Sequence, residues 1–291
     1  MNINSYIGIN NGVRRPSLVG IGGVVALVGL SVLAVATEVG KVLVIAWVAF
    51  AAMAVGAALG ARADTTSPYR LVWGYGLASG AMVASASMFL VPQAITIGVE
   101  AGAPQLGGIG VALGLVVGYS AHVLGHRLTH VDVGMDTTTA QISAHALSAG
   151  VIIGFVYGSM PGLGLLLGLA IVSHKGPAGY AAARRLRRDG RSAMALLFPA
   201  AGIGLTAIPT AVVALPDVPG VNAVVFGFAA GIFLHVAMDF LPHCEAGSEI
   251  DQVCSLHEES HDLLDRLRTH AVGSTLVGGA VVVAAWFALS P

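Results

Sequence analysis

The sequence predicts an all-α, polytopic membrane protein, and composition, hydropathy and segment length each favour this class. Of its 291 residues, 56% are hydrophobic and only 10% are charged, and the mean hydropathy is +0.83. These values do not suit a water-exposed surface. Apolar segments recur with the length that a helix needs to cross a hydrocarbon core of roughly 30 Å. The net charge of −1 offers no basic surface, so we expect no nucleic-acid partner.

Nine apolar segments are expected to cross the membrane as helices. They cover residues 17–37, 42–61, 71–97, 105–126, 139–157, 161–183, 194–215, 220–242 and 270–289. Residues 1–16 are then a cytoplasmic tail and residues 17–291 a single transmembrane bundle, with one long cytoplasmic loop at residues 243–269. The first segment could instead be a secretory signal, but it is longer than the usual signal core of about 7–15 residues, which favours its retention.

The positive charges predict the orientation of the bundle. A cytoplasmic N-terminus places alternate connections inside, where Lys and Arg accumulate. Of the 14 Lys and Arg residues, Lys41 falls outside and Lys175 within a span. The others fall inside: Arg14, Arg15, Arg62, Arg70, Arg127, Arg184, Arg185, Arg187, Arg188, Arg191, Arg266 and Arg268. We therefore expect a multi-pass protein of the cell membrane with its N-terminus inside and its C-terminus outside.

Two short stretches suggest an inverted internal repeat. Met88 to Gln93 (MFLVPQ) ends the third segment and Met238 to His243 (MDFLPH) ends the eighth. Each stretch has a glycine, Gly80 or Gly231, eleven or twelve residues before its proline. The two segments cross in opposite directions, so the repeats would be related by an axis in the membrane plane. The alternative is that Leu-Pro at a helix end is simply common.

Two histidines are expected at bilayer depth. His145 in the fifth segment and His174 in the sixth lie about seven and ten residues from the inside end, which at about 1.5 Å per residue places them at similar depth. Ionisable side chains within a bilayer usually face the bundle interior, and imidazole is a common ligand of transition metals. Pro177 removes a backbone donor and frees a nearby carbonyl to face a cavity. The pair therefore indicates metal binding or a proton relay, with hydrogen-bonded packing as the alternative.

Residues 144–150 and 173–179, with their flanking helices, resemble the ZIP (Zrt/Irt-like) family of metal-ion transporters. The first run is similar to the family motif His-Asn-x-Pro-Glu-Gly on its fourth helix, and the second to a related motif on its fifth. Residues 80–93 and 227–242 are similar to the family's second and seventh helices. The resemblance covers most of the chain and implies a ZIP-like bundle of eight transmembrane helices in an inverted 3+2+3 arrangement, with residues 17–37 as an additional leading helix.

The central metal site that the resemblance implies is only partly present, because the histidines are kept while their neighbours differ. The family's asparagines, first proline and glutamates are replaced by Ala146, Ser148, Ala149, Lys175 and Ala178. A positive charge about 5 Å from a divalent ion, at an effective dielectric of ~20, would cost roughly 6–7 kcal/mol. Lys175 is therefore turned away, neutral, or a built-in cation in place of one metal, and we favour the last. Ser148, Lys175 and Pro177 are expected along the pathway.

Further candidate ligands lie at the expected inside end. Three histidines at i, i+4 and i+8 share one face of the fourth segment and precede Asp132 and Asp136, and a histidine and an aspartate form an i, i+4 pair on the eighth. The candidates are His122, His126, His130, His235 and Asp239. The alternative is an interfacial histidine cluster without a ligand.

The long loop carries two more patterns. Cys244 and Cys254 are expected to remain reduced thiols on the cytoplasmic side. His257, Glu258 and His261 match H-E-x-x-H, which on a helix binds zinc and supplies a general base. Because the motif lies in a charged loop, we favour a solvated helix over metal buffering, and metal buffering over catalysis.

We therefore expect a ZIP-like permease, and not an enzyme, that moves zinc or a similar divalent cation toward the cytoplasm. The metal would be its substrate, with no required cofactor, and its other partners would be the lipid bilayer and, as an option, a second copy in a homodimer. One alternative is a ZIP-fold protein that has lost metal transport and carries another solute or is regulatory. Another is a membrane zinc peptidase that uses the H-E-x-x-H motif.

Overall fold

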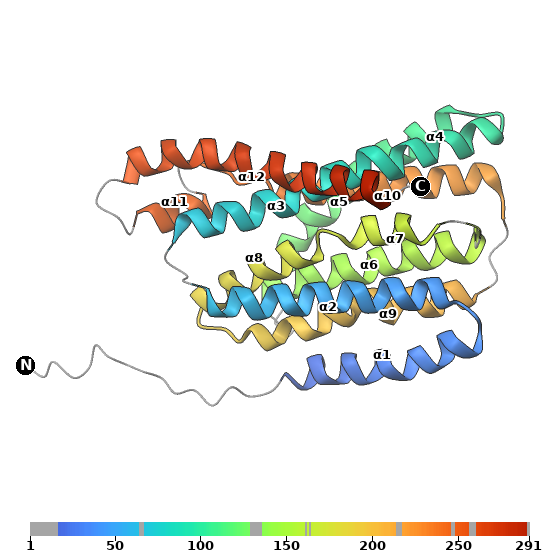
Figure 1. The fold of residues 1–291 in the computed structure, drawn as a ribbon, viewed down its shortest axis with the longest axis horizontal. Coiled ribbons are helices and arrows are strands. Elements are labelled where there is room, and N and C mark those ends of the chain that lie inside the picture. The colour runs from blue at the N-terminus through green and yellow to red at the C-terminus, as the bar shows by residue number, and fades with distance from the viewer. Residues whose placement is uncertain are drawn as a thin grey trace, which may run out of the picture.

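The computed structural model describes residues 17–63, 67–128, 136–160, 162, 164–213, 217–245, 248–255 and 260–289. Helices are the only regular elements in these ranges, and they lie along a common direction in one bundle (Figure 1). The helices are α1 (Leu18–Ala36), α2 (Gly40–Arg62), α3 (Pro68–Ser85), α4 (Val91–Glu100), α5 (Gln105–Leu128), α6 (Thr137–Ser159), α7 (Leu165–Val172), α8 (Lys175–Arg188), α9 (Leu197–Val212), α10 (Pro219–Asp239), α11 (Glu249–Cys254) and α12 (Ser260–Leu289).

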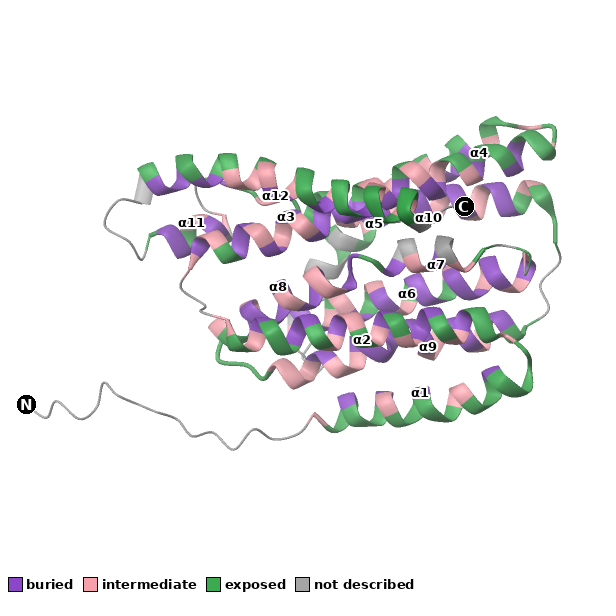
Figure 2. Cartoon of the chain, in the orientation of Figure 1, coloured by how far each residue is buried: buried purple, intermediate pink, exposed green. Residues whose placement is uncertain are grey.

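Seven helical segments in the described part of the chain are long and apolar enough to cross a membrane. They are Leu18–Ala36, Gly40–Arg62, Pro68–Glu100, Thr138–Ser159, Ala193–Val212, Pro219–Asp239 and Asp262–Ala288. Their outer faces are exposed (Figure 2) and carry many large apolar side chains, as expected of surfaces that contact lipid. The expected class of multi-pass helical membrane protein is therefore confirmed. The apolar part of α5, Gln105–Ala121, is shorter, and the sixth expected span is not a single helix.

The sixth expected span, residues 161–183, is divided into α7 and α8 at Ser173 and His174. Pro177 explains the position of this break. A proline ring collides with the carbonyl group four residues earlier, here that of Ser173, if the helix continues through it. In the first turn of a new helix the missing N–H costs nothing, and Pro177 occupies the first turn of α8. The break is partway along the bundle (Figure 1).

The third expected span is longer than residues 71–97. After α3 a π-helical turn, η2 (Ala86–Leu90), leads directly into α4, which ends at Glu100. The stretch from Met88 to Gln93 therefore lies within this crossing and does not end it, whereas Pro242 does follow the end of α10. A π turn inserts one extra residue into a helix, and Pro92 is accommodated in the first turn of α4.

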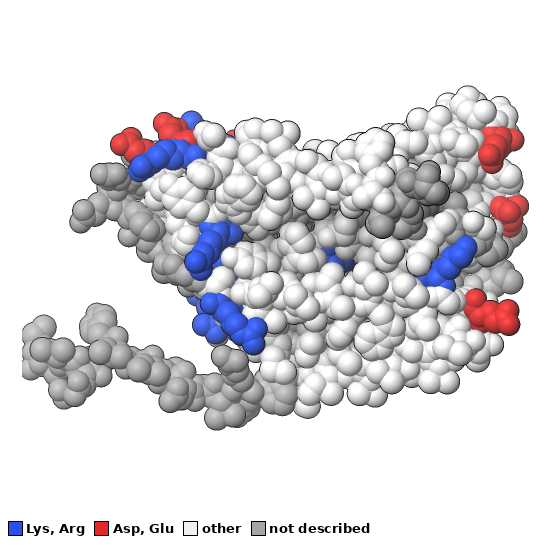
Figure 3. Space-filling view, in the orientation of Figure 1, with Lys and Arg blue, Asp and Glu red and all other residues white. Residues whose placement is uncertain are grey.

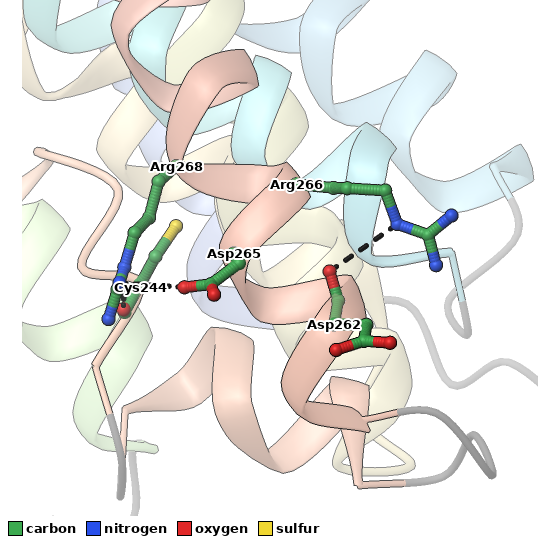
Figure 4. A network of polar contacts seen from close by, with 5 residues as sticks. All are labelled: Cys244, Asp262, Asp265, Arg266 and Arg268. Carbon is green, nitrogen blue, oxygen red and sulfur yellow. Dashed lines mark hydrogen bonds and ion pairs between the residues drawn. The ribbon is translucent and has the colours of Figure 1, made fainter.

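The long loop expected at residues 243–269 is largely helical, because it contains α11 and the first turns of α12. The ninth helix thus begins at Ser260 and not near residue 270. Hydrogen bonds tie this end together (Figure 4): Arg268 donates to the Cys244 carbonyl at 3.4 Å and to Asp265 at 2.7 Å, and Arg266 donates to the Asp262 carbonyl at 3.3 Å. The charged residues between Ser260 and Thr269 therefore belong to α12 and form its polar beginning, ahead of its apolar part.

Four helix pairs are packed so closely that only glycine fits at the contact. The pairs are α5 with α10, α3 with α12, α6 with α9, and α2 with α8. A Cβ atom would overlap a carbonyl oxygen of the partner helix at Gly231 against Val111, Gly80 against Thr275, Gly154 against Ala207 and Gly60 against Tyr180. Small residues at such contacts are the usual means by which membrane helices associate. Helix α1 packs mainly against α9.

The charged side chains lie at the two ends of the bundle, and the belt between them is nearly uncharged (Figure 3). Arginines occupy the ends of α2, α3, α8 and α12 that lie together at one end. They include Arg62, Arg70, Arg184, Arg185, Arg187, Arg188, Arg266 and Arg268. Arg184 to Arg188 belong to the last turns of α8, where a loop was expected. Lys41 lies at the opposite end of α2, near Glu38.

Candidate functional site

A cavity of about 890 Å³ lies inside the bundle, between α6, α8 and α10 and the chain that follows α10. Polar groups predicted from the sequence as ligands or pathway residues line it together: His145, Ser148, His174, Lys175, His235 and Asp239. They come from three helices that are far apart in the sequence. The fold therefore brings most of the predicted site residues to one cavity.

His145 of α6 and His174, the residue before α8, form the inner part of this site. Their ring centroids are 5.8 Å apart, and the planes are tilted by 60°. Phe233 of α10 contacts both rings, with centroid distances of 4.9 Å to His174 and 6.4 Å to His145. The ring of Phe233 is buried and fixes one side of the pair. The matched depth predicted from the sequence thus corresponds to adjacent side chains.

His145 has an unused polar atom. Its Nε2 atom is buried and has no hydrogen-bond partner among the described residues. Ser148, one turn later on α6, donates its hydroxyl hydrogen to the backbone carbonyl of His145 at 3.0 Å. A buried imidazole nitrogen usually has a partner, so the free Nε2 atom indicates room for a ligand in the cavity.

Lys175 is the first residue of α8, and only 2% of its surface is exposed. It lines the cavity and interacts electrostatically with His145. No hydrogen bond or ion pair joins Lys175 to any residue that the structure describes. Burying an ammonium group without a counter-charge is costly, which makes this side chain the least expected feature of the cavity.

His235 and Asp239 form the outer part of the site, one turn apart on α10. The Nε2 atom of His235 lies 3.4 Å from a carboxylate oxygen of Asp239, so the predicted i, i+4 pair is formed. Tyr119 packs edge-on against the imidazole at 6.5 Å between centroids. Among the described residues that line the cavity, Asp239 is the acidic one.

The cavity lining also includes polar residues that the sequence analysis did not assign to this site, among them Tyr75, Gln141, Arg185 and His243. Arg185 had been counted only as a loop charge. Lys175, Ala178, Ala182 and Arg185 line the cavity at spacings of three and four, which is one face of a helix. Had the helix been continued to residue 188, this periodicity could have placed Arg185 beside the predicted site.

Other predicted residues lie elsewhere. Pro177 lines a separate surface groove between α2 and α8, so the structure does not place it on the cavity wall. Asp136 caps the N-terminus of α6 by accepting from the Thr139 amide at 3.0 Å, which is a structural role. His122 and His126 belong to α5, but their side chains are outside the described part, as are the whole of His130 and Asp132.

The H-E-x-x-H motif also falls outside what the structure describes. His257 and Glu258 are not described, and His261 belongs to α12 without a described side chain. Within the described residues, no group of three or more His, Cys, Asp or Glu side chains is arranged to hold a metal ion. Among the described residues, the ionisable side chains that line the cavity include imidazoles, two basic groups and one carboxylate.

No model of a known protein family matches this sequence. No curated protein matches it either.

Proposed function

We propose that this protein is a ZIP-like permease that moves a divalent metal cation, zinc or a similar ion, across the membrane through its central cavity. In this proposal the nine spans are the leading helix α1 and eight further helices in an inverted 3+2+3 arrangement. The arginine-rich end faces the cytoplasm, following the usual bias of Lys and Arg, and transport is directed toward it.

The helix contacts support the inverted arrangement. In an inverted repeat each helix of one half has an equivalent in the other half, here α2 with α9, α3 with α10, α5 with α12 and α6 with α8. Under this equivalence the contact between α5 and α10 corresponds to the contact between α12 and α3. The contact between α6 and α9 likewise corresponds to the contact between α8 and α2. The glycines of the sequence echo follow the same equivalence, because Gly80 of α3 abuts α12 and Gly231 of α10 abuts α5. An inverted repeat requires this correspondence.

The observation that carries the transport proposal is the approach of His145 and His174 from two different helices. Their rings are 5.8 Å apart and both face the same cavity. Two imidazoles at this spacing can bind one first-row metal ion, and such sites in transporters usually lie near the bilayer midplane. His235 and Asp239 offer an imidazole and a carboxylate between this pair and the arginine-rich end.

A second candidate, transport of a solute other than a metal cation, is favoured by Lys175. This buried ammonium group lies next to His174 in the chain and lines the same cavity, where it would repel a divalent ion. A ZIP-like fold that has exchanged its substrate would account for Ala149 and Ala178, which take the places of the family's carboxylates.

Zinc uptake by proteoliposomes with an entrapped fluorescent indicator tests the proposal, with iron, manganese, cobalt and cadmium as further substrates. Replacing His145 or His174 with Ala should lower the uptake rate by about tenfold or more, since each removes one of two ligands. His270→Ala is the matched control, because His270 lies outside the cavity, next to Trp73.

The amount of folded protein in each preparation is measured by gel filtration. Wild-type vesicles that take up none of these metals faster than protein-free vesicles would contradict metal transport. Uptake that persists in the double His145→Ala, His174→Ala variant would remove the pair from the pathway.

A further inference from the structure

The charges that face the cavity are mostly positive. Lys175 and Arg185 are basic, and Asp239 is the acidic residue in the described lining. Asp239 already lies 3.4 Å from His235. Its carboxylate is on α10, one turn beyond His235 toward the helix end, while Lys175 begins α8 beside His174. The inner part of the cavity therefore has a buried cation to which no acidic side chain of the described residues is joined.

The helix that begins at Lys175 adds to the positive charge at this point of the cavity. Lys175 is the first residue of α8, a helix of 14 residues that begins at the break within the bundle. A helix N-terminus carries a partial positive charge and backbone N–H groups without intrahelical partners. A lysine is normally unfavourable there, and an anion is favourable. Broken transmembrane helices use such N-termini to hold anionic groups of substrates.

The neighbouring side chains supply directed contacts. Lys175 is 2% exposed and is joined to no described residue by a hydrogen bond or ion pair. The buried Nε2 atom of His145 also has no partner within the described ranges. An imidazole N–H at this atom and the ammonium group can both donate hydrogen bonds to an oxygen anion.

We propose that the cavity binds a small oxyanion, of the carboxylate, carbonate or phosphate class, at Lys175, the first turn of α8 and the imidazole of His145. The anion offsets the buried charge of Lys175 and occupies the part of the cavity that Ala178 lines. This site exists whether or not a metal is transported. As a consequence that rests on the proposed function, the anion also supplies the negative charge that zinc needs beside His145 and His174.

Isothermal titration of purified protein in a neutral detergent and a zwitterionic buffer tests the site, with sodium acetate, sodium bicarbonate and inorganic phosphate as separate probes. At least one should bind saturably with one site per chain. Lys175→Met should weaken this binding by about tenfold or more, as loss of a charged partner does. Lys41→Met is the matched control, since Lys41 is the other lysine of the chain and lies at the opposite end of α2, and it should leave binding unchanged.

Thermal melting checks that each variant is folded. If Lys175→Met does not fold, His145→Gln and Lys175→Arg replace it: the first should weaken binding and the second should retain it. Absence of saturable binding for all three salts, or equal binding by wild type and Lys175→Met, would overturn the site. A short-chain anionic phospholipid is titrated in parallel, and binding of the lipid alone would assign the cavity to a headgroup and overturn a free oxyanion.

Zinc titrations with and without the bound anion separate this inference from the proposed function. Zinc binding that requires the anion supports both. Anion binding without any zinc binding supports the oxyanion site and contradicts metal transport. Zinc binding of equal affinity in the presence and absence of the anion, with no anion bound, contradicts the oxyanion site alone.

Discussion

Gly118 of α5 lies directly against the imidazole of His235 on α10. A Cβ atom at Gly118 would be 2.8 Å from Cδ2 of His235 and 3.0 Å from Cγ. The Nε2 atom of the ring lies 3.4 Å from Asp239 and Tyr119 packs edge-on against the ring, so moving the ring would disturb both contacts. The absence of a side chain at residue 118 therefore determines where His235 sits in the cavity.

We predict that Gly118→Ala displaces the His235 ring and destabilises the protein by about 1–3 kcal/mol, the usual cost of overpacking. Thermal unfolding in detergent measures the change. Gly108→Ala on the same helix is the control, because no atom lies within 4 Å of the Cβ that it adds. Equal melting temperatures for the two variants would show that the α5–α10 contact is looser than described.

Ser148 should be reachable by water-soluble reagents through the cavity. In a background with Cys244→Ser and Cys254→Ser, Ser148→Cys is expected to react with a charged methanethiosulfonate reagent, because residue 148 is exposed and lines the cavity. Ala146→Cys on the same helix is the control, since Ala146 is fully buried. Labelling from each side of sealed vesicles then identifies the side to which the cavity opens. Labelling of both variants at one rate would refute the described cavity.

Arg184 is expected to stabilise the junction of α2 and α3. Only 2% of its surface is exposed, and its guanidinium group donates to the Ser67 carbonyl at 2.9 Å. Arg184→Met should cost about 1.5–3 kcal/mol, the usual range for hydrogen bonds to charged groups. Arg187→Met, at an exposed position of the same helix, should change stability by less than about 0.5 kcal/mol. Chemical denaturation in mixed micelles compares the two, and a larger loss in Arg187→Met would contradict the assignment.

The two thiols should react slowly near neutral pH. Burial raises the pKa of the Cys244 thiol, although Arg268 opposes this shift. Burial also raises the pKa of Cys254, and the charges of Asp251 and Cys244 add to it. A raised pKa lowers the thiolate fraction at a given pH, and the thiolate is the reactive form. Iodoacetamide should therefore label the folded protein more slowly than the unfolded chain. The labelling rate should continue to increase at pH values above those at which an ordinary thiol is already fully ionised.

The matched measurement uses single-cysteine variants, Cys244→Ser and Cys254→Ser, labelled folded and after denaturation. The free thiols belong to a small apolar cluster with Ile250, Val253 and Leu267. Rapid labelling of the folded protein at pH 7 would show that this cluster does not exclude the reagent.

Apolar length was enough to predict the membrane class and most helix positions, because a crossing helix must satisfy its own backbone groups. The same signal failed where polar or special residues act through three-dimensional contacts. Asp262 and Asp265 fell in the loop expected at residues 243–269, yet they belong to the solvated first turns of α12. Pro209 lies inside α9 without ending it, whereas Pro177 coincides with the start of α8.

The central histidines could be predicted from depth alone, because two spans of similar length place His145 and His174 at one level. Sequence could not show that Phe233 contacts both rings or that Gly118 makes room for His235, since these contacts join helices that are far apart in the chain. Arg185 was missed for a simpler reason. The span was expected to end at residue 183, so the helical periodicity that points Arg185 into the cavity was cut short.

The depth of the cavity has an electrical consequence. A space of about 890 Å³ with polar groups along its wall is large enough to hold water. If the cavity opens to one aqueous side, the insulating layer between the two sides is reduced to the part of the bundle beyond His145 and His174. A membrane voltage falls mainly across this thin layer, where moving one elementary charge is worth about 2.3 kcal/mol per 100 mV. For the transport proposed above, movement of an ion between the cavity mouth and the histidines would then be nearly independent of voltage, whereas passage beyond them would carry almost all of the electrical work.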